Sequence, residues 1–176
     1  MRYQISYLIK GDAKAYHENL SNTLASIYRL KPVNERIDPH LTLKSPFETD
    51  SIFEVEEIIE GFVERAEPQP ITLKGFSRFE DRLIYMDMTA PDETHTLISN
   101  FQDMLLRIPW ISFRDYEKPV TLHATLCYPR TKEQADEIFS KLTSKEGRSF
   151  DLMLDNITIL KRGPQRWETF REYKLG

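Results

Sequence analysis

A four-residue pattern, His-apolar-Thr-Leu, occurs once in each half of the chain. The first copy is His40-Leu41-Thr42-Leu43 and the second is His123-Ala124-Thr125-Leu126. Successive side chains of a β-strand point to opposite faces, so the His and Thr of each copy share a face about 7 Å apart, while the apolar residues point into a core. Two such strands set side by side would arrange two imidazoles and two hydroxyls around one polar site.

The recurrence of the pattern favours a function for it. A single copy is equally well explained by a half-buried strand whose His is satisfied by a carbonyl group. The chain has 4 histidines, however, and two of them occupy matching places in the pattern. The pair therefore indicates a functional site more strongly than either copy alone.

The hydrophobic periodicity around the two motifs is duplicated as well. We expect a strand at 2–9, a helix at 13–30, the first motif strand from 39, a helix at 51–67, strands at 71–79 and 82–89, a helix at 92–106, the second motif strand at 120–127, a helix at 131–144, and strands at 149–161 and 167–174. Ser51 and Thr131 each begin a capping-box pattern. The sequence thus predicts one domain over residues 1–176 with an internally duplicated, bilobal α+β fold. Two antiparallel-sheet lobes would carry helices outside and one motif each at a central cleft.

Composition limits the partners and the surroundings of the protein. The net charge of −4 argues against a broad binder of nucleic acid, so no DNA duplex partner is expected. Cys127 is the single cysteine, which excludes an internal disulfide. The apolar run at the N-terminus is too short for a signal peptide, and no run is long enough for a membrane span. We expect a cytoplasmic monomer without a membrane partner.

Two imidazoles suit paired acid and base catalysis near neutral pH. Such a pair fits in-line displacement at phosphorus, in which one ring activates the attacking oxygen and the other protonates the leaving oxygen. Thr42 and Thr125 would donate hydrogen bonds to the non-bridging phosphate oxygens, and Lys44, by alternation on the face of His40, would add positive charge. A bell-shaped pH profile with a maximum between about pH 6 and 8 follows.

No metal or other cofactor is required by this chemistry. The chain has neither an HExxH pattern nor a glycine-rich phosphate loop, and two histidines alone make a poor zinc site. Cys127, by alternation on the face of His123, leaves a covalent Cys-His enzyme as an alternative, although a lone cysteine is more often a small buried residue. His17 and His95 are expected on solvated helix faces.

The paired His-Leu-Thr-Leu and His-Ala-Thr-Leu motifs resemble those of the two-histidine (2H) phosphoesterase superfamily, which includes 2′-5′ RNA ligase-like proteins and cyclic phosphodiesterases. The resemblance extends over the chain in length, motif spacing and element order. It implies a bilobal α+β cleft and metal-independent hydrolysis of 2′,3′-cyclic phosphates or related phosphodiesters at RNA ends or in small cyclic nucleotides. His40 and His123 would be the catalytic pair, with His123 as base and His40 as acid, and Thr42 and Thr125 the phosphate-binding residues.

The sequence departs from the family pattern behind both motifs. Many relatives carry an Arg directly after the second motif, whereas here Tyr128 comes first and Arg130 follows Pro129. Behind the first motif stands Lys44-Ser-Pro-Phe47. Tyr128, Arg130 and Phe47 are therefore candidate substrate contacts, and Phe76 is a further aromatic residue that could stack on a base. The competing hypothesis is a catalytically silent module that binds an RNA end or a nucleotide on the same scaffold.

Overall fold

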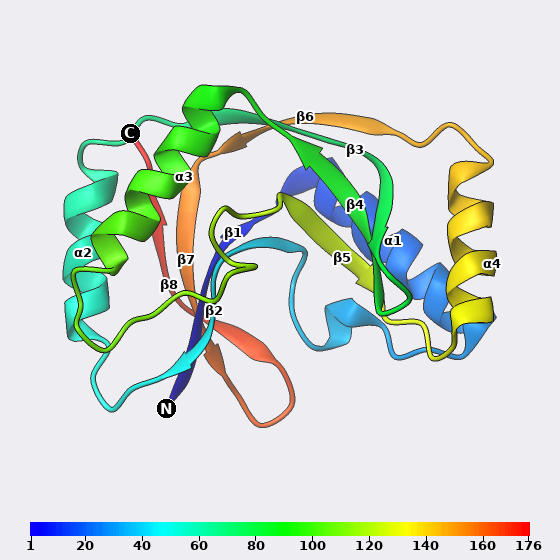
Figure 1. The fold of residues 1–176 in the computed structure, drawn as a ribbon, viewed down its shortest axis with the longest axis horizontal. Helices are drawn as coiled ribbons and strands as arrows, with labels where there is room; N and C mark the ends of the chain where they lie inside the picture. The colour runs from blue at the N-terminus through cyan, green and yellow to red at the C-terminus, as the bar shows by residue number, and fades with distance from the viewer.

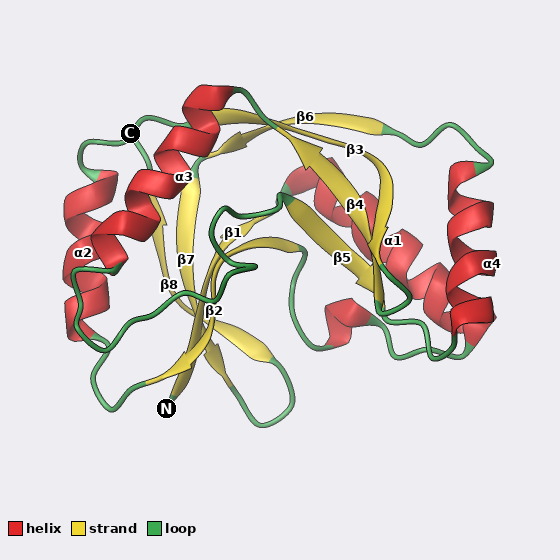
Figure 2. Ribbon diagram, viewed as in Figure 1, coloured by secondary structure: helices red, strands yellow, loops and turns green.

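The computed structural model describes residues 1–176 and contains eight strands, four α-helices and one 3₁₀ helix. In chain order these are β1 (Arg2–Leu8), α1 (Gly11–Tyr28), η1 (Val33–Glu35), β2 (His40–Glu48), α2 (Phe53–Val63), β3 (Gln69–Phe79), β4 (Leu83–Thr89), α3 (Asp92–Leu105), β5 (His123–Cys127), α4 (Lys132–Thr143), β6 (Ser149–Leu154), β7 (Asn156–Arg162) and β8 (Trp167–Lys174). The fold is α+β, as predicted, with the strands between outer helices (Figures 1 and 2).

The strands form two four-stranded antiparallel sheets. Their orders are β2-β1-β7-β8 and β5-β4-β3-β6, so each motif strand is the edge strand of its own sheet. β1 supports β2, and β4 supports β5, in matching places. The predicted duplication and the bilobal arrangement are therefore confirmed, with one motif on each lobe (Figure 1).

Two of the four helices, α1 and α3, are exchanged between the lobes. α1 follows β1 but packs against β5 of the other sheet, and α3 follows β4 but packs against β2. Ser21 of α1 donates a hydrogen bond from its hydroxyl to the Leu126 carbonyl (2.8 Å), and Gln102 of α3 donates one to the Leu43 carbonyl (2.9 Å). Each motif strand is thus held by the helix that follows the supporting strand of the opposite lobe, which ties the two motifs together.

The predicted strand at 149–161 is wrong as one element. It is divided at Asp155 into β6, which joins the second sheet, and β7, which joins the first. The amide side chain of Asn156 bonds both the backbone N–H (3.0 Å) and the carbonyl (3.1 Å) of Leu8, so it acts as a backbone partner where the chain crosses between sheets. The Asp-Asn dipeptide, which is poor in β propensity, was the local signal of this break.

Of the two predicted helix caps, the one at Thr131 is found at the start of α4, and the one at Ser51 is not the N-cap of α2. The Thr131 hydroxyl accepts the backbone N–H of Gln134 at the start of α4 (3.2 Å). Residue Ile52, not Ser51, is the N-cap of α2, and it makes no side-chain capping bond. The burial of apolar side chains therefore fixes the position of α2, as is general for helices in proteins.

A continuous apolar core joins both lobes. It includes Ile5, Leu41 and Leu43 from the first sheet and Ile84 and Leu126 from the second, all with at most 2% of their surface exposed. The apolar residues of both motifs thus point into one interior, as alternation predicts. No helix is both long enough and apolar enough to span a membrane.

Candidate active site

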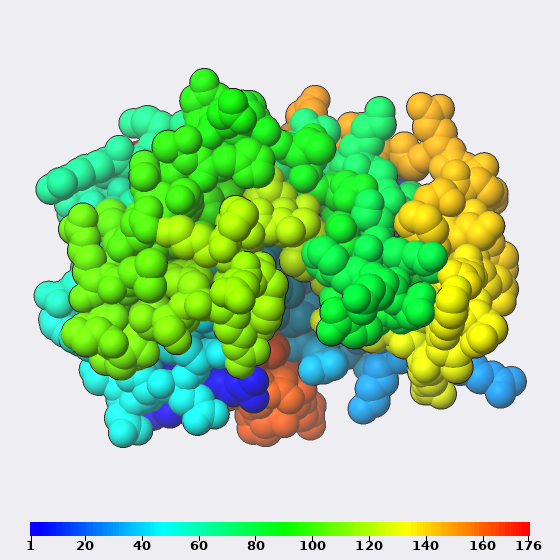
Figure 3. Space-filling view, viewed as in Figure 1, coloured from blue at the N-terminus to red at the C-terminus, as the bar shows by residue number.

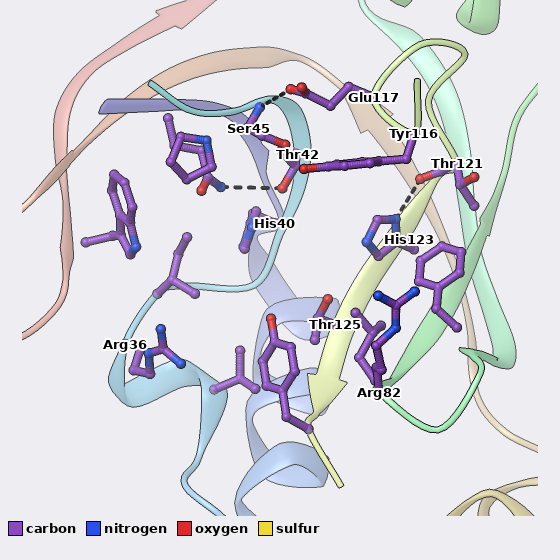
Figure 4. Close-up of a pocket in the computed structure, with 18 of the residues that line it drawn as sticks. Arg36, His40, Thr42, Ser45, Arg82, Tyr116, Glu117, Thr121, His123 and Thr125 are labelled. Carbon is purple, nitrogen blue, oxygen red and sulfur yellow. Dashed lines mark hydrogen bonds between the residues drawn. The ribbon is translucent and has the colours of Figure 1, made fainter. Parts of the chain in front are cut away.

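A cleft of about 1110 Å³ lies between the two lobes. Its mouth is the hollow at the centre of Figure 3. His40 and Thr42 line it from β2, and His123 and Thr125 line it from β5. The structure therefore brings the four motif side chains together, with the two histidines on opposite walls (Figure 4).

The two imidazoles are oriented in the same way. Nδ1 of His40 lies 2.8 Å from the Asp38 carbonyl, and Nδ1 of His123 lies 2.6 Å from the Thr121 carbonyl. A carbonyl oxygen can only accept, so Nδ1 carries the proton in both rings. Nε2 of each neutral ring then keeps its lone pair, and it is the nitrogen available to a ligand in the cleft. This backbone bond to the residue two positions upstream fixes the tautomer of both rings.

Burial gives the two histidines unequal affinities for a proton. Desolvation and the nearby His123 together lower the pKa of His40 to about 4, against the opposing effects of the Asp38 carbonyl and carboxylate. Desolvation also lowers the pKa of His123, and the Thr121 carbonyl opposes that shift. The ring of His123 packs edge-on against Phe79 (5.2 Å) and Tyr85 (5.1 Å). Both rings are therefore neutral at pH 7 in the free protein.

The two threonines differ in their support. Gln4 of β1 donates from Nε2 to the Thr42 hydroxyl oxygen (3.4 Å) and to the Ser6 hydroxyl (2.9 Å). The Thr42 proton is thereby left free for donation into the cleft. Gln4 itself lines the cleft, although no motif residue pointed to it. Its signal was the polar face of the strand that supports the motif.

Lys44 does not line the cleft, contrary to its expected place beside a phosphate. Ile5 pairs with Lys44 but the next residue, Ser6, pairs with Thr42, so Leu43 is an extra residue in β2. This β-bulge interrupts the alternation that the prediction assumed. The Lys44 side chain is instead buried in an ion pair with Glu117 (2.7 Å), with 5% and 4% of the two side chains exposed.

The same irregularity occurs in the second motif. Ile84 pairs with Cys127 and Tyr85 pairs with Thr125, which makes Leu126 the extra residue of β5. Cys127 is buried rather than on the face of His123, and burial raises the pKa of its thiol to about 12. A buried thiol with a raised pKa is a poor nucleophile, so the Cys-His alternative loses its support.

Glu117 links the first motif strand to the loop that precedes the second, residues 106–122. Its carboxylate accepts bonds from the Lys44 ammonium, from the Ser45 backbone N–H (2.9 Å) and from the Arg114 backbone N–H (2.8 Å). Burial raises the pKa of Glu117, but these donors outweigh it and hold the pKa of the carboxyl below its usual range. The loop in turn places Tyr116 across the cleft (Figure 4).

The other candidate contacts are divided between cleft and core. Tyr128 and Arg130 line the cleft, whereas Phe47 packs against Tyr3 (6.2 Å) and Trp110 (5.9 Å) away from it. Phe76 is also outside the lining. Several other lining residues come from loops, turns and strand ends and had no local pattern to predict them: Lys31, Arg36, Arg82, Tyr116, Arg162 and Trp167.

The expectation that His17 is solvated is wrong, whereas His95 is exposed as expected. His17 lies on the face of α1 that packs beneath β5 and has 1% of its surface exposed. Neither ring nitrogen has a hydrogen-bond partner. Desolvation lowers its pKa to about 4, against the opposing effect of the Ala124 backbone.

No group of three or more His, Cys, Asp or Glu side chains in the structure is arranged to hold a metal ion. The donors that face the cleft are imidazoles, hydroxyls and cations, which suit a phosphate better than a metal.

Comparison with known proteins decides the family. The profile of the 2′-5′ RNA ligase superfamily matches residues 17–166, which include both motifs. The chain belongs to this superfamily of 2H phosphoesterases. No curated protein matches the sequence at a significant level.

Solved structures share the fold over the whole superfamily domain. TT0787 of Thermus thermophilus has a TM-score of 0.69 at 13% identity, over 99% of this chain and 98% of its own. Escherichia coli LigT complexed with 3′-AMP has a TM-score of 0.65 at 14% identity, over 99% and 97%. LigT complexed with phosphate has a TM-score of 0.56 at 14% identity, over 99% and 96%. At these identities the likeness is one of fold.

Proposed function

We propose that the protein is a metal-independent phosphodiesterase that opens a 2′,3′-cyclic phosphate, at an RNA end or in a nucleotide, by paired-histidine catalysis. The observation that carries the proposal is the matched orientation of His40 and His123. Each ring is locked through Nδ1 on a backbone carbonyl, and each leaves Nε2 for the same cleft. Superfamily membership and nucleotide complexes of LigT with 3′-AMP and ATP add support.

The reaction follows from these positions. One neutral imidazole takes a proton from a water molecule, whose oxygen forms a new bond to phosphorus. The bond from phosphorus to O2′ or O3′ breaks on the opposite side, and the second imidazole, protonated, donates its proton to that oxygen. The product is a phosphomonoester. The first ring ends the reaction with one more proton and the second with one fewer, so proton exchange with solvent restores both.

Thr42 and Thr125 would hold the non-bridging oxygens, where negative charge increases during the reaction. The phosphate also supplies the charge that the histidines need. An anion in contact with an imidazole favours the imidazolium form and raises its pKa. Substrate binding therefore counteracts the desolvation that keeps both rings neutral in the free protein.

The pH dependence tests this mechanism. Because kcat/KM reports the free enzyme and both histidine pKa values are lowered, its maximum should lie between about 4 and 6.5, below the range expected from the sequence. The profile of kcat should shift to higher pH, since the bound phosphate raises the pKa values. Both limbs belong to the coupled pair. The measurement is hydrolysis of adenosine 2′,3′-cyclic phosphate by the purified protein across pH.

The same assay with a chelator separates the alternatives. We expect EDTA to leave the rate unchanged. Loss of activity with EDTA, restored by a divalent ion and accompanied by a single rising limb, would mean that a metal-bound hydroxide attacks and that the histidines are ligands. Binding of the nucleotide without turnover at any pH would instead assign a silent binding module.

A further inference from the structure

The positive charges of the cleft are concentrated in one region. The protein has a net charge of −4, yet six of the cleft-lining residues are Lys or Arg and the single acidic one is Glu117. The charge of Glu117 is already committed to Lys44. The cleft is therefore a local cationic surface on an acidic protein.

Much of this charge is organised by the connection between α1 and β2, residues 29–39. Lys31 and Arg36 belong to this connection, and Arg130 donates from Nη2 to its Arg29 carbonyl (2.9 Å). The connection leads directly into His40 and supplies the Asp38 carbonyl that orients it. Arg36 lies on the His40 side of the cleft, opposite His123 (Figure 4).

The C-terminal hairpin of β7 and β8 fixes this connection from the other side. The Trp167 backbone N–H donates to the Arg36 carbonyl (2.7 Å), and Arg166 pairs with the Asp38 carboxylate. Lys14 of α1 also pairs with Asp38 (3.1 Å). The segment is thus held at Arg29, Arg36 and Asp38 by groups from other parts of the chain. An irregular segment held in this way is preorganised, which lowers the entropic cost of binding a ligand there.

The hairpin adds its own ligand-binding groups. Arg162 lies over the Trp167 ring (6.0 Å), and both line the cleft beside the connection. Lys31, Arg36 and Arg162 form no ion pair, although many other surface cations of the protein do. We call Lys31, Arg36, Arg162 and Trp167 the cationic strip.

The His123 side has a different character. Arg82 is paired with Glu80 at the tip of the β3–β4 hairpin (3.3 Å), and the rings of Phe79 and Tyr85 pack directly against His123. In the cationic strip, by contrast, Arg162 lies over the Trp167 ring and has no acidic partner. This combination of a positive groove and a stacking ring is how proteins bind single-stranded nucleic acid without reading its sequence.

We propose that the cationic strip binds the nucleotides that precede the reacting phosphate, so that the substrate is the end of a single-stranded oligonucleotide rather than a mononucleotide. This inference rests on the proposed function. The phosphate that reacts lies between the histidines, and the upstream phosphates lie along Lys31, Arg36 and Arg162. A neighbouring base stacks on Trp167. The volume of about 1110 Å³ exceeds the usual range of pockets for a single small ligand, about 300–1000 Å³.

The test compares two substrates that share one reacting group: adenosine 2′,3′-cyclic phosphate, and a hexaribonucleotide that ends in the same adenosine cyclic phosphate. We expect kcat/KM for the hexanucleotide to exceed that for the mononucleotide by at least about 10-fold at low salt. Arg36→Ala and Arg162→Ala should each reduce this ratio by about 3- to 10-fold, because each removes a phosphate contact. Arg171→Ala, on β8 and paired with Glu56 outside the cleft, is the matched control and should preserve the ratio.

A binding measurement separates this inference from the proposed chemistry. The probe is a fluorescent hexaribonucleotide that ends in a 3′-phosphate and cannot react, and its anisotropy is followed as salt is increased. Loss of one phosphate contact should make the slope of log K against log salt shallower by about 0.7 in Arg36→Ala and in Arg162→Ala. Salt-dependent binding that these variants weaken, with no hydrolysis of either cyclic substrate, would support the strip and overturn the proposed function.

The opposite result would overturn the strip alone. In that result, the protein hydrolyses the cyclic mononucleotide and the hexanucleotide with equal kcat/KM. The ratio of the two kcat/KM values is then also unchanged in Arg36→Ala and in Arg162→Ala. A ratio that falls equally in Arg171→Ala would also contradict the inference, since it would reflect the charge of the whole protein.

Discussion

The two motif strands are built alike as far as their fourth motif residues, Leu43 and Leu126, and diverge at the residue that follows. β2 and β5 each orient a histidine through a carbonyl two residues upstream, and each has a bulge at the fourth motif residue. The bulged carbonyls, of Leu43 and Leu126, both accept a side-chain bond from an exchanged helix. The next residue is Lys44 in one strand and Cys127 in the other.

The two lobes are alike in the motif residues and differ in the residue that follows, Lys44 or Cys127. The preserved part carries the groups that can act on a phosphate. The changed part builds the surroundings, because Lys44 holds Glu117 and so the loop at 106–122, whereas Cys127 fills core space. A symmetric pair of motifs thus lies in an asymmetric cleft. The two lobes therefore share their motif residues and differ in the packing that directly follows them.

The largest expected effect tests whether the two histidines are equivalent. His40→Ala and His123→Ala should each lower kcat/KM on the cyclic nucleotide by about 10²–10⁴-fold, because acid and base each contribute that much. The double variant should lose little more than the worse single variant if the rings act as a unit. The assay is hydrolysis with thermal unfolding as the control for folding. Near-normal activity in either single variant would contradict the paired mechanism.

The second prediction concerns the position after each bulge. Lys44→Met should lower the free energy of unfolding by about 3–5 kcal/mol, since it leaves the Glu117 carboxylate buried without its cation. Cys127→Ala, the matched change in the other lobe, should cost about 1 kcal/mol. Urea denaturation measures both. Adding Glu117→Gln to Lys44→Met should recover part of the loss, and equal costs for the two single variants would refute the structural role of the pair.

The third prediction compares the two threonines. Thr42→Ala and Thr125→Ala should each reduce kcat/KM by about 10- to 100-fold, the value of a hydrogen bond to a charged group. Gln4→Leu should produce a smaller loss that is confined to the Thr42 side, and it should add little to Thr42→Ala. Kinetics of the single and double variants give the coupling. Full additivity of Gln4→Leu and Thr42→Ala would show that Gln4 does not act through Thr42.

The smallest effect is on stability below neutral pH. The folded-state pKa of His17 is about 4, below its ordinary 6.5, so the unfolded chain takes up the proton first as pH falls. The contribution of His17 to the free energy of unfolding is therefore full above pH 6.5 and decreases as the pH falls toward 4. At pH 5 the decrease is about 2 kcal/mol. His17→Leu should make the loss between pH 7 and 5 smaller. The exposed His95→Gln is the control, and an unchanged pH dependence in His17→Leu would contradict this account.

The sequence by itself determined the local part of the site. Alternation along a strand is a property of neighbouring residues, so the motifs alone predicted that His40, Thr42, His123 and Thr125 face one way and that Leu41 and Ala124 face the core. The repeated order of elements predicted two lobes with a motif on each. Alternation did not predict the orientation of the residues after the bulges, because one extra residue reverses the face of every later side chain.

Only the tertiary structure decided what surrounds the motifs. Lys44 and Cys127 are turned inward by bulges that depend on pairing with β1 and β4, and His17 is buried because α1 packs on the sheet of the other lobe. Arg36 and Trp167 meet through a bond between a connection and a hairpin far apart in the sequence. Such contacts depend on how the whole chain closes, and no local pattern of residues encodes them.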